Sequence, residues 1–210
     1  MTPRSSMPGV SSTWVTSQWK YRPFPGHFST VINIWLKGYE GTSLSDLTAA
    51  IGIERPSLYR VFASKEELFG QTLERYRRQH LEFVEQALEI PSIEIAIETF
   101  ICRFIEVIAD PDTPLGCLTL NGAIACAPEH ETIRQKLVNY RAYYEGVLRR
   151  RFEAALAKDE LVDNAAPEVL AHFVISVCGG LALQAKSGDL RETLCATTKM
   201  ALSCVSQQLR

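Results

Sequence analysis

The chain has 210 residues, of which 46% are hydrophobic and 22% are charged, and its formal net charge at pH 7 is −2. This is an ordinary globular balance, and the length allows one large domain or a small domain plus a medium one. The six cysteines form no C-x-x-C pair and no Cys/His zinc spacing, so we expect neither a metal nor a cofactor. The first residues lack a continuous apolar segment, which argues against a secretory signal and for reduced thiols.

Apolar residues repeat mainly at intervals of three and four, and the alternation typical of strands is nearly absent. We therefore predict an all-α fold. Residues 1–26 are rich in Ser, Thr and Pro and show no periodicity, so we expect either a disordered arm or an upstream start with no structural role. Helices are predicted over 27–37, 43–51, 55–62, 65–88, 92–109, 116–127, 130–158, 166–187 and 189–208.

Short-range signals define the ends of the first helices. Gly38 and Gly52 are placed to end the first and second helices, and Pro56 lies near the start of the third, where a missing N–H does no harm. The segments 43–46 (SLSD) and 64–67 (SKEE) resemble capping boxes. Much later, the apolar run 169–185 is short for a bilayer span, so we interpret it as a buried helix and expect no membrane.

Residues 44–62 have the pattern of two short helices joined by a tight turn. Gly52 permits the left-handed backbone that such a turn needs. The predicted inward positions are Leu47, Ile51, Ile53, Leu58 and Val61. A helix of this size fits the major groove of B-DNA, and its polar face carries Arg55, Ser57, Tyr59 and Arg60. Residues 1–80 also hold ten Lys and Arg against six Asp and Glu, while the remainder holds twelve against eighteen, which suits a first part that meets a polyanion.

The stretch GYEGTSLSDLTAAIGIERPSLYRVFASKEELF (38–69) resembles the DNA-binding domain of the TetR family of bacterial transcriptional regulators. The shared features are the G-Y-x-x-T-S entry, the G-I/V turn, the S-L-Y-x-x-F third helix and the S-K-E-x-L-F opening of the fourth. The resemblance implies a helix-turn-helix domain over 27–72 and a larger helical ligand-binding and dimerisation domain over 73–210. It also implies a cytoplasmic homodimer, by default a repressor, that binds a palindromic operator in double-stranded DNA and is released by a small-molecule effector.

The resemblance assigns two kinds of DNA contact. Groups at helix starts and the Tyr59 hydroxyl on the third helix would bind phosphates, and other side chains of the third helix would meet base edges. The phosphate candidates are Thr42, Ser43, Tyr59 and Lys65. The base-edge candidates are Arg55, Ser57 and Arg60, and Pro56 beside them is also a DNA-binding candidate.

The regulatory part offers an apolar region with a few polar groups, which suits a small and largely hydrophobic ligand. The pocket candidates are Phe100, Phe104, Cys117, Leu120, Asn121, Ile124 and Tyr144. Cys117 is expected at a helix N-terminus, where the dipole lowers the pKa of a thiol, so a redox- or electrophile-sensing regulator is an alternative. The resemblance places the dimer interface in the last two helices, and its candidates are Phe173, Val177, Gly180, Leu181, Leu194 and Ala201.

Two other functions are considered. No nucleophile elbow, P-loop, dinucleotide fingerprint or metal-ligand pair is present, so we do not expect an enzyme. Glu54 stands where Ser or Asn often caps the third helix, and the first helix has Asn33 at an expected apolar position. These two departures motivate a helical ligand-binding or adaptor protein with a weakened DNA reader.

Overall fold

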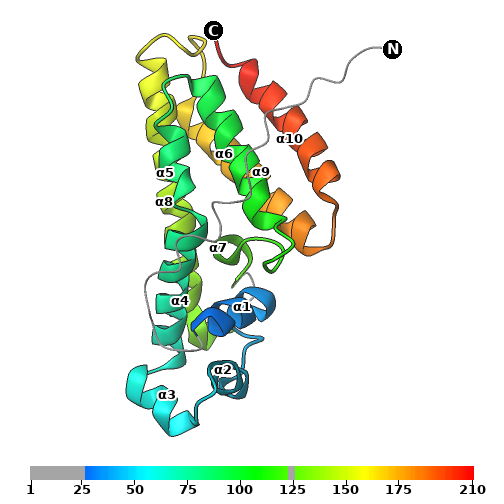
Figure 1. Ribbon diagram of the computed structural model, residues 1–210. Coiled ribbons are helices and arrows are strands. Elements are labelled where there is room, and N and C mark those ends of the chain that lie inside the picture. Colours follow the sequence, from blue (N-terminus) through cyan, green and yellow to red (C-terminus); the bar gives the residue numbers. More distant parts are fainter. Residues whose placement is uncertain (1–26, 123–125) are drawn as a thin grey trace, which may run out of the picture.

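The computed structural model describes residues 27–122 and 126–210 (Figure 1). Within these ranges the chain forms ten α-helices and one 3₁₀ helix, and its β pairing is an isolated bridge between Leu161 and Leu209. The predicted all-α fold is therefore confirmed. The elements are α1 (His27–Lys37), α2 (Leu44–Ile51), α3 (Arg55–Val61), α4 (Lys65–His80), α5 (Phe83–Leu88), α6 (Ile93–Ile108), α7 (Leu118–Asn121), η2 (Pro128–His130), α8 (Glu131–Leu156), α9 (Pro167–Lys186) and α10 (Arg191–Ser206).

The caps of α2 form as the sequence predicts. The Ser43 hydroxyl accepts from the Asp46 N–H, and the Asp46 carboxylate accepts from the Ser43 N–H, so the capping box is complete. Gly52 follows α2 with φ of +76° and donates its N–H to the Thr48 carbonyl. This left-handed residue turns the chain directly into α3, whose first turn contains Pro56.

The long helix expected over 65–88 is instead two helices, α4 and α5. No Pro or Gly lies at the break, where Leu81 takes a non-helical conformation (φ −122°, ψ 5°). Leu81, Phe83 and Val84 are all buried in the hydrophobic cluster, so the residues on both sides of the break pack into the core.

The helix expected over 116–127 is also much shorter in the described residues, because α7 comprises only four residues. The carbonyl of Gly122 accepts a hydrogen bond from the Tyr39 N–H at 2.9 Å. That acceptor would serve the next helical turn if α7 continued. This hydrogen bond fixes Gly122 against the turn that follows α1.

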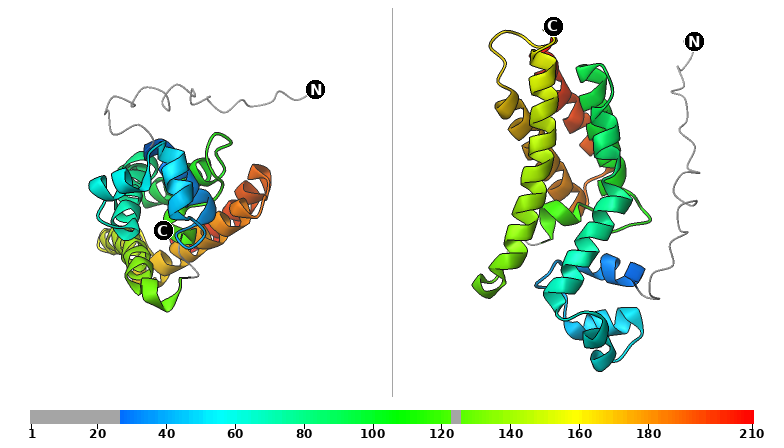
Figure 2. Two further views of the ribbon diagram at one scale, coloured as in Figure 1. Left: turned by 90° about the horizontal axis from the view of Figure 1, so that it is seen from below. Right: turned by 90° about the vertical axis from the view of Figure 1, so that its left-hand side faces the viewer.

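The helices α1, α2 and α3 lie together at one end of an elongated molecule, and α4 leads from them into the remaining bundle (Figures 1 and 2). Because α4 is continuous from 65 to 80, the expected domain boundary at 72/73 falls within a helix. In the described part of the chain, α9 alone is long and apolar enough to cross a membrane. It packs against α6, α8 and α10, so much of its apolar surface belongs to the core.

Candidate DNA interface and regulatory core

The third helix, α3, is held by one buried face and exposes the other. Leu58 and Phe62 are 2% and 3% exposed, whereas Tyr59 is 49% exposed. Val61 was expected to point inward, but it is 45% exposed. The helix ends at Val61, and the extended backbone of Phe62 (φ −123°, ψ 122°) directs that ring into the core in its place.

The outward side of α3 is basic. Arg55, Pro56 and Arg60 are exposed, and Ser57 is half-buried. Among the described residues, neither arginine forms an ion pair with a carboxylate. Arg55 donates from Nη2 to the Ser45 hydroxyl at 2.8 Å, which aligns its guanidinium with α2. The face thus keeps two positive charges available for an external anion.

Thr42 has an internal role. Its side chain is fully buried, and its hydroxyl donates to the Gly38 carbonyl at 2.7 Å, so this geometry does not support the predicted phosphate contact. The Ser43 hydroxyl and N–H are both bonded to the Asp46 carboxylate, at 2.7 and 2.8 Å. A phosphate contact by Ser43 stays a prediction and requires that carboxylate to be displaced.

Lys65 lies at the start of α4 and packs on an aromatic ring. Its Nζ is 4.1 Å from the centroid of Tyr39, and burial lowers its pKa. The Tyr39 hydroxyl donates to Glu66 at 2.5 Å. This bond lowers the pKa of Glu66 to about 2, while burial is the main reason that the pKa of Tyr39 is raised. Phosphate binding by Lys65 stays a prediction.

The segment 116–122 is attached by two hydrogen bonds to α1 and to the turn that follows it. The Trp35 indole donates to the Gly116 carbonyl at 3.1 Å, and the Tyr39 N–H donates to the Gly122 carbonyl. Gly38 lies at the closest approach, since a Cβ on it would be 2.9 Å from the Gly122 oxygen. The end of the molecule formed by α1, α2 and α3 is therefore connected to the remaining helices through segment 116–122, which we call the α1 clamp.

A second connection joins Glu40 to the start of α8. The Glu40 carboxylate accepts from the Ala127 N–H at 2.9 Å and contacts His130 Nδ1 at 2.7 Å. These two contacts, with the Ala127 bond the larger cause, lower the pKa of Glu40. The His130 ring also packs edge-on against Tyr39, with centroids 5.0 Å apart.

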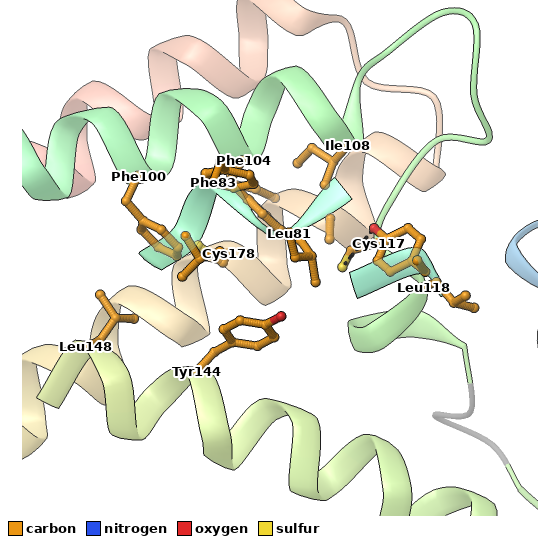
Figure 3. Packing of buried hydrophobic residues seen from close by; sticks show 14 of the residues in the cluster. Leu81, Phe83, Phe100, Phe104, Ile108, Cys117, Leu118, Tyr144, Leu148 and Cys178 are labelled. Carbon is orange, nitrogen blue, oxygen red and sulfur yellow. Dashed lines mark hydrogen bonds between the residues drawn. The ribbon is translucent and has the colours of Figure 1, made fainter. Parts of the chain in front are cut away.

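The predicted pocket residues divide into core and surface groups. Phe100, Phe104, Cys117 and Tyr144 are buried in one hydrophobic cluster (Figure 3). Leu120 and Asn121 are half-buried, and the Asn121 side chain donates to the Ala182 carbonyl at 3.2 Å. Ile124 lies outside the described residues. The Asn121 side chain therefore joins α7 to α9 through a hydrogen bond.

Three hydroxyls surround the Cys117 thiol within this apolar core. The Tyr76 hydroxyl donates to Cys117 Sγ at 3.4 Å, and Thr119 Oγ1 lies 3.1 Å from it. Tyr144 is 7% exposed, its hydroxyl is directed toward Cys117 (Figure 3), and this hydroxyl has no hydrogen-bond partner among residues 27–122 and 126–210. Burial raises the pKa of Tyr144. Because α7 has only four residues, the helix-dipole argument for Cys117 loses its basis.

The six dimer candidates also divide. Leu181, Leu194 and Ala201 are buried within the single chain, so they are core residues. Phe173 and Val177 are half-buried and Gly180 is exposed. The large exposed apolar side chains on or beside the last two helices are Val169, Leu183, Leu190 and Met200.

A groove of about 510 Å³ between α4 and α8 was not predicted from the sequence. Its lining residues are Arg77, Lys136, Asn139, Tyr140 and Tyr143. The only local signal for it is the group of tyrosines on α8, and the partner residue on α4 is about sixty positions away.

These features define a class: a DNA-binding regulator with a helix-turn-helix reader attached to a larger helical domain. Residues 33–72 match the family model for bacterial regulatory proteins of the tetR family, and residues 96–200 match the tetracyclin repressor-like C-terminal domain. The chain belongs to the TetR family of transcriptional regulators.

Individual relatives agree with this assignment. The chain is 31% identical to the HTH-type transcriptional repressor ComR of Escherichia coli, over 76% of this chain and 77% of ComR. It is 25% identical to the repressor DhaR of Mycobacterium sp., over 75% and 79%. A cysteine mutant of the TetR family regulator CifR, complexed with a 26 bp double-strand operator DNA, superposes with a TM-score of 0.82 at 32% identity, covering 88% of this chain and 97% of that one.

Proposed function

We propose that this protein is a cytoplasmic transcriptional repressor that binds a palindromic operator as a homodimer and is released by a small-molecule effector. The observation that carries the proposal is the outward face of α3, with Arg55, Tyr59 and Arg60 exposed on a helix anchored by Leu58. Relatives named as repressors support the sign of regulation. Arginine prefers guanine through its paired donors, and the Tyr59 hydroxyl suits a phosphate oxygen.

The outward side of α9 supplies the proposed dimer interface. Val169, Phe173, Ser176, Gly180 and Leu183 follow one another at intervals of four and three, so they share one stripe of the helix. Val169 and Leu183 are 65% and 53% exposed. In the part of the chain that the structure describes, no side chain or other element lies within 4 Å of a Cβ built on Gly180, which leaves room for a partner helix. A twofold pair of readers then requires an inverted-repeat site.

The α1 clamp gives the proposed route from the regulatory domain to DNA. Cys117 and Thr119 lie inside segment 116–122, whose ends hydrogen-bond to Trp35 of α1 and to Tyr39 just after it. A ligand that repositions this segment also moves α1 and the two helices packed with it. Release from DNA follows if the effector binds the displaced arrangement more tightly.

Selection of bound sites from random duplex DNA by the purified protein tests the proposal. The expected result is an inverted repeat whose half-sites are separated by one helical turn, about 34–36 Å, or a multiple of it. Binding measured by fluorescence anisotropy should weaken as salt is raised. Failure to enrich any sequence in dilute buffer would contradict the proposal and favour the adaptor alternative. That alternative is motivated by Glu54, whose side chain makes no capping hydrogen bond to α3 among the described residues.

A thiol-based switch is the second candidate, and the hydrogen-bonded Cys117 sulfur beside the unpartnered Tyr144 hydroxyl favours it. At 1% exposure the sulfur is reached only when segment 116–122 opens. If this candidate holds, N-ethylmaleimide releases the protein from its operator, and Cys117→Ala abolishes the response while Cys204→Ala does not. The exposed Cys204 is the matched control. Release that persists in Cys117→Ala would rule out this candidate.

A further inference from the structure

The groove between α4 and α8 has an excess of positive charge. Arg77 is held by Glu74 through two hydrogen bonds of 3.0 and 2.9 Å, and Arg78 pairs with the same carboxylate at 2.8 Å. Two guanidinium groups therefore share one carboxylate. Lys136 has no ion pair within the part of the chain that the structure describes and is exposed on α8. These groups leave the groove suited to an anion.

Two carboxylates near the groove accept hydrogen bonds from its tyrosines. Glu74 also accepts from the Tyr140 hydroxyl at 3.3 Å, and Glu85 accepts from the Tyr143 hydroxyl at 2.6 Å. Both bonds fix the tyrosine rings in the groove wall. The Glu74 charge is compensated by Arg77 and Arg78, so it opposes an incoming anion only weakly.

Aromatic surface forms the rest of the wall. Tyr140 is half-buried, and Tyr143 is 46% exposed and packs edge-on against Tyr144, with centroids 5.2 Å apart. Asn139 adds an amide that can donate or accept. A volume of about 510 Å³ lies within the usual range for small-molecule sites. The groove therefore combines flat apolar surface with two cationic groups that come from different helices.

The two cations belong to different helices, which gives the site a regulatory position. Arg77 is on α4, the helix that begins at the DNA-reading end, and Lys136 is on α8. Lys136 Nζ extends to α4, where it lies 3.1 Å from a Cβ built on Gly70. A ligand held by both groups would tie α4 to α8 and so restrict the orientation of the helix that carries α3.

We propose that this groove binds a small organic anion with an aromatic body, such as an aromatic carboxylate, and that such an anion is the effector. The carboxylate is held between Lys136 and Arg77, and the ring lies against Tyr140 and Tyr143. The inference rests on the proposed function and adds to it the ligand class and the place of binding. It locates the effector outside the closed core around Cys117, so the effector acts on α4 directly, which is an alternative to the route through the α1 clamp.

Isothermal titration calorimetry with the purified full chain tests the proposal. The binding of 2-naphthoate is compared with that of one neutral and one cationic analogue of similar shape. We expect 2-naphthoate to bind about fivefold or more tightly than 2-naphthamide, and 2-naphthylmethylammonium to bind weakest. Lys136→Gln should lower the 2-naphthoate affinity about fivefold and leave the amide unchanged. Lys158→Gln, at an exposed lysine beyond the end of α8, is the matched control and should alter neither.

Equal affinity for the three compounds, no 2-naphthoate binding, or an unchanged affinity in Lys136→Gln would overturn the proposal. Circular dichroism confirms that each variant is folded. Operator binding is measured separately by anisotropy, and 2-naphthoate should weaken it in the wild type more than in Lys136→Gln. A protein that binds its operator but not 2-naphthoate refutes only the groove proposal. One that binds 2-naphthoate but no duplex refutes the proposed function.

Discussion

The outward faces of α3 and α9 differ in chemistry although both helices are anchored by buried leucines, Leu58 and Leu181. The face of α3 shows a tyrosine and two arginines, whereas that of α9 shows Val169 and Leu183. A charged face loses affinity for its partner as salt is added, and an apolar face does not. The difference indicates that α3 meets a polyanion and α9 meets another apolar surface.

We expect the largest effect from a charge placed on the apolar face of α9. Leu183→Glu should convert the dimer to a monomer, because a carboxylate buried in an apolar interface has no counter-charge. Since the two readers then bind independently, operator affinity should fall by about a hundredfold. Sedimentation velocity measures the oligomer, and fluorescence anisotropy measures the affinity.

Ile95→Glu is the matched control for that change, because Ile95 is 52% exposed on α6. It should leave both the sedimentation coefficient and the operator affinity unchanged. If Leu183→Glu remained dimeric while Ile95→Glu dissociated, the interface would have to be placed on α6.

A substitution on α3 tests whether its charged face reads base pairs. Arg60→Ala should reduce discrimination at one base pair of each half-site by about 1–3 kcal/mol. It should leave the dimer intact, because Arg60 is exposed on α3 and far along the chain from α9. Competition between the selected operator and single-base variants measures the loss. Arg149→Ala, at an exposed arginine of α8, should show no such loss, and an equal effect from both variants would argue for unspecific charge.

The two faces also differ in how far the sequence could predict them. The reader depends on neighbours in the chain: a capping box, the Gly52 turn and Pro56 are all visible within twenty residues. In contrast, the break between α4 and α5 has no Pro or Gly to mark it, and it lies at Leu81, which is buried in the hydrophobic cluster.

The same reasoning explains the errors in the regulatory part. Helical periodicity identifies the apolar residues of α9 and α10 but cannot separate a stripe that faces the chain's own core from one that faces a partner. Leu181 and Leu194 were therefore assigned to the interface although they are buried within the chain. The groove residues Arg77 and Lys136 come from helices that meet only in the fold.

The α1 clamp lies between the two faces and can be tested through Gly38. Gly38→Ala should lower the free energy of unfolding by about 2 kcal/mol, because φ is +71° and the new Cβ would lie 2.9 Å from the Gly122 oxygen. Gly188→Ala separates the effect of positive φ from that of the close contact. Its φ is +100°, but in the described part of the chain no atom lies within 4 Å of a Cβ built on it. That control should cost about 1 kcal/mol. Urea denaturation measures both, and equal losses would show that the close approach to Gly122 has no energetic weight.

The smallest expected effect concerns pH at the junction of α1 and α4. His80 stacks on Tyr76 and packs edge-on against Trp35, and burial lowers its pKa to about 4. The unfolded chain, with an ordinary histidine pKa near 6.5, then binds a proton that the folded chain does not, so stability falls as pH drops from about 6.5 toward 4. The slope from His80 is at most about 1.4 kcal/mol per pH unit. Between pH 6.5 and 5, above the range in which Glu66 and Glu74 titrate, thermal unfolding of His80→Phe should show a shallower slope than wild type. The exposed His172 is the control, and if His172→Gln flattened the slope instead, the pH dependence would belong to the α9 face and not to the junction.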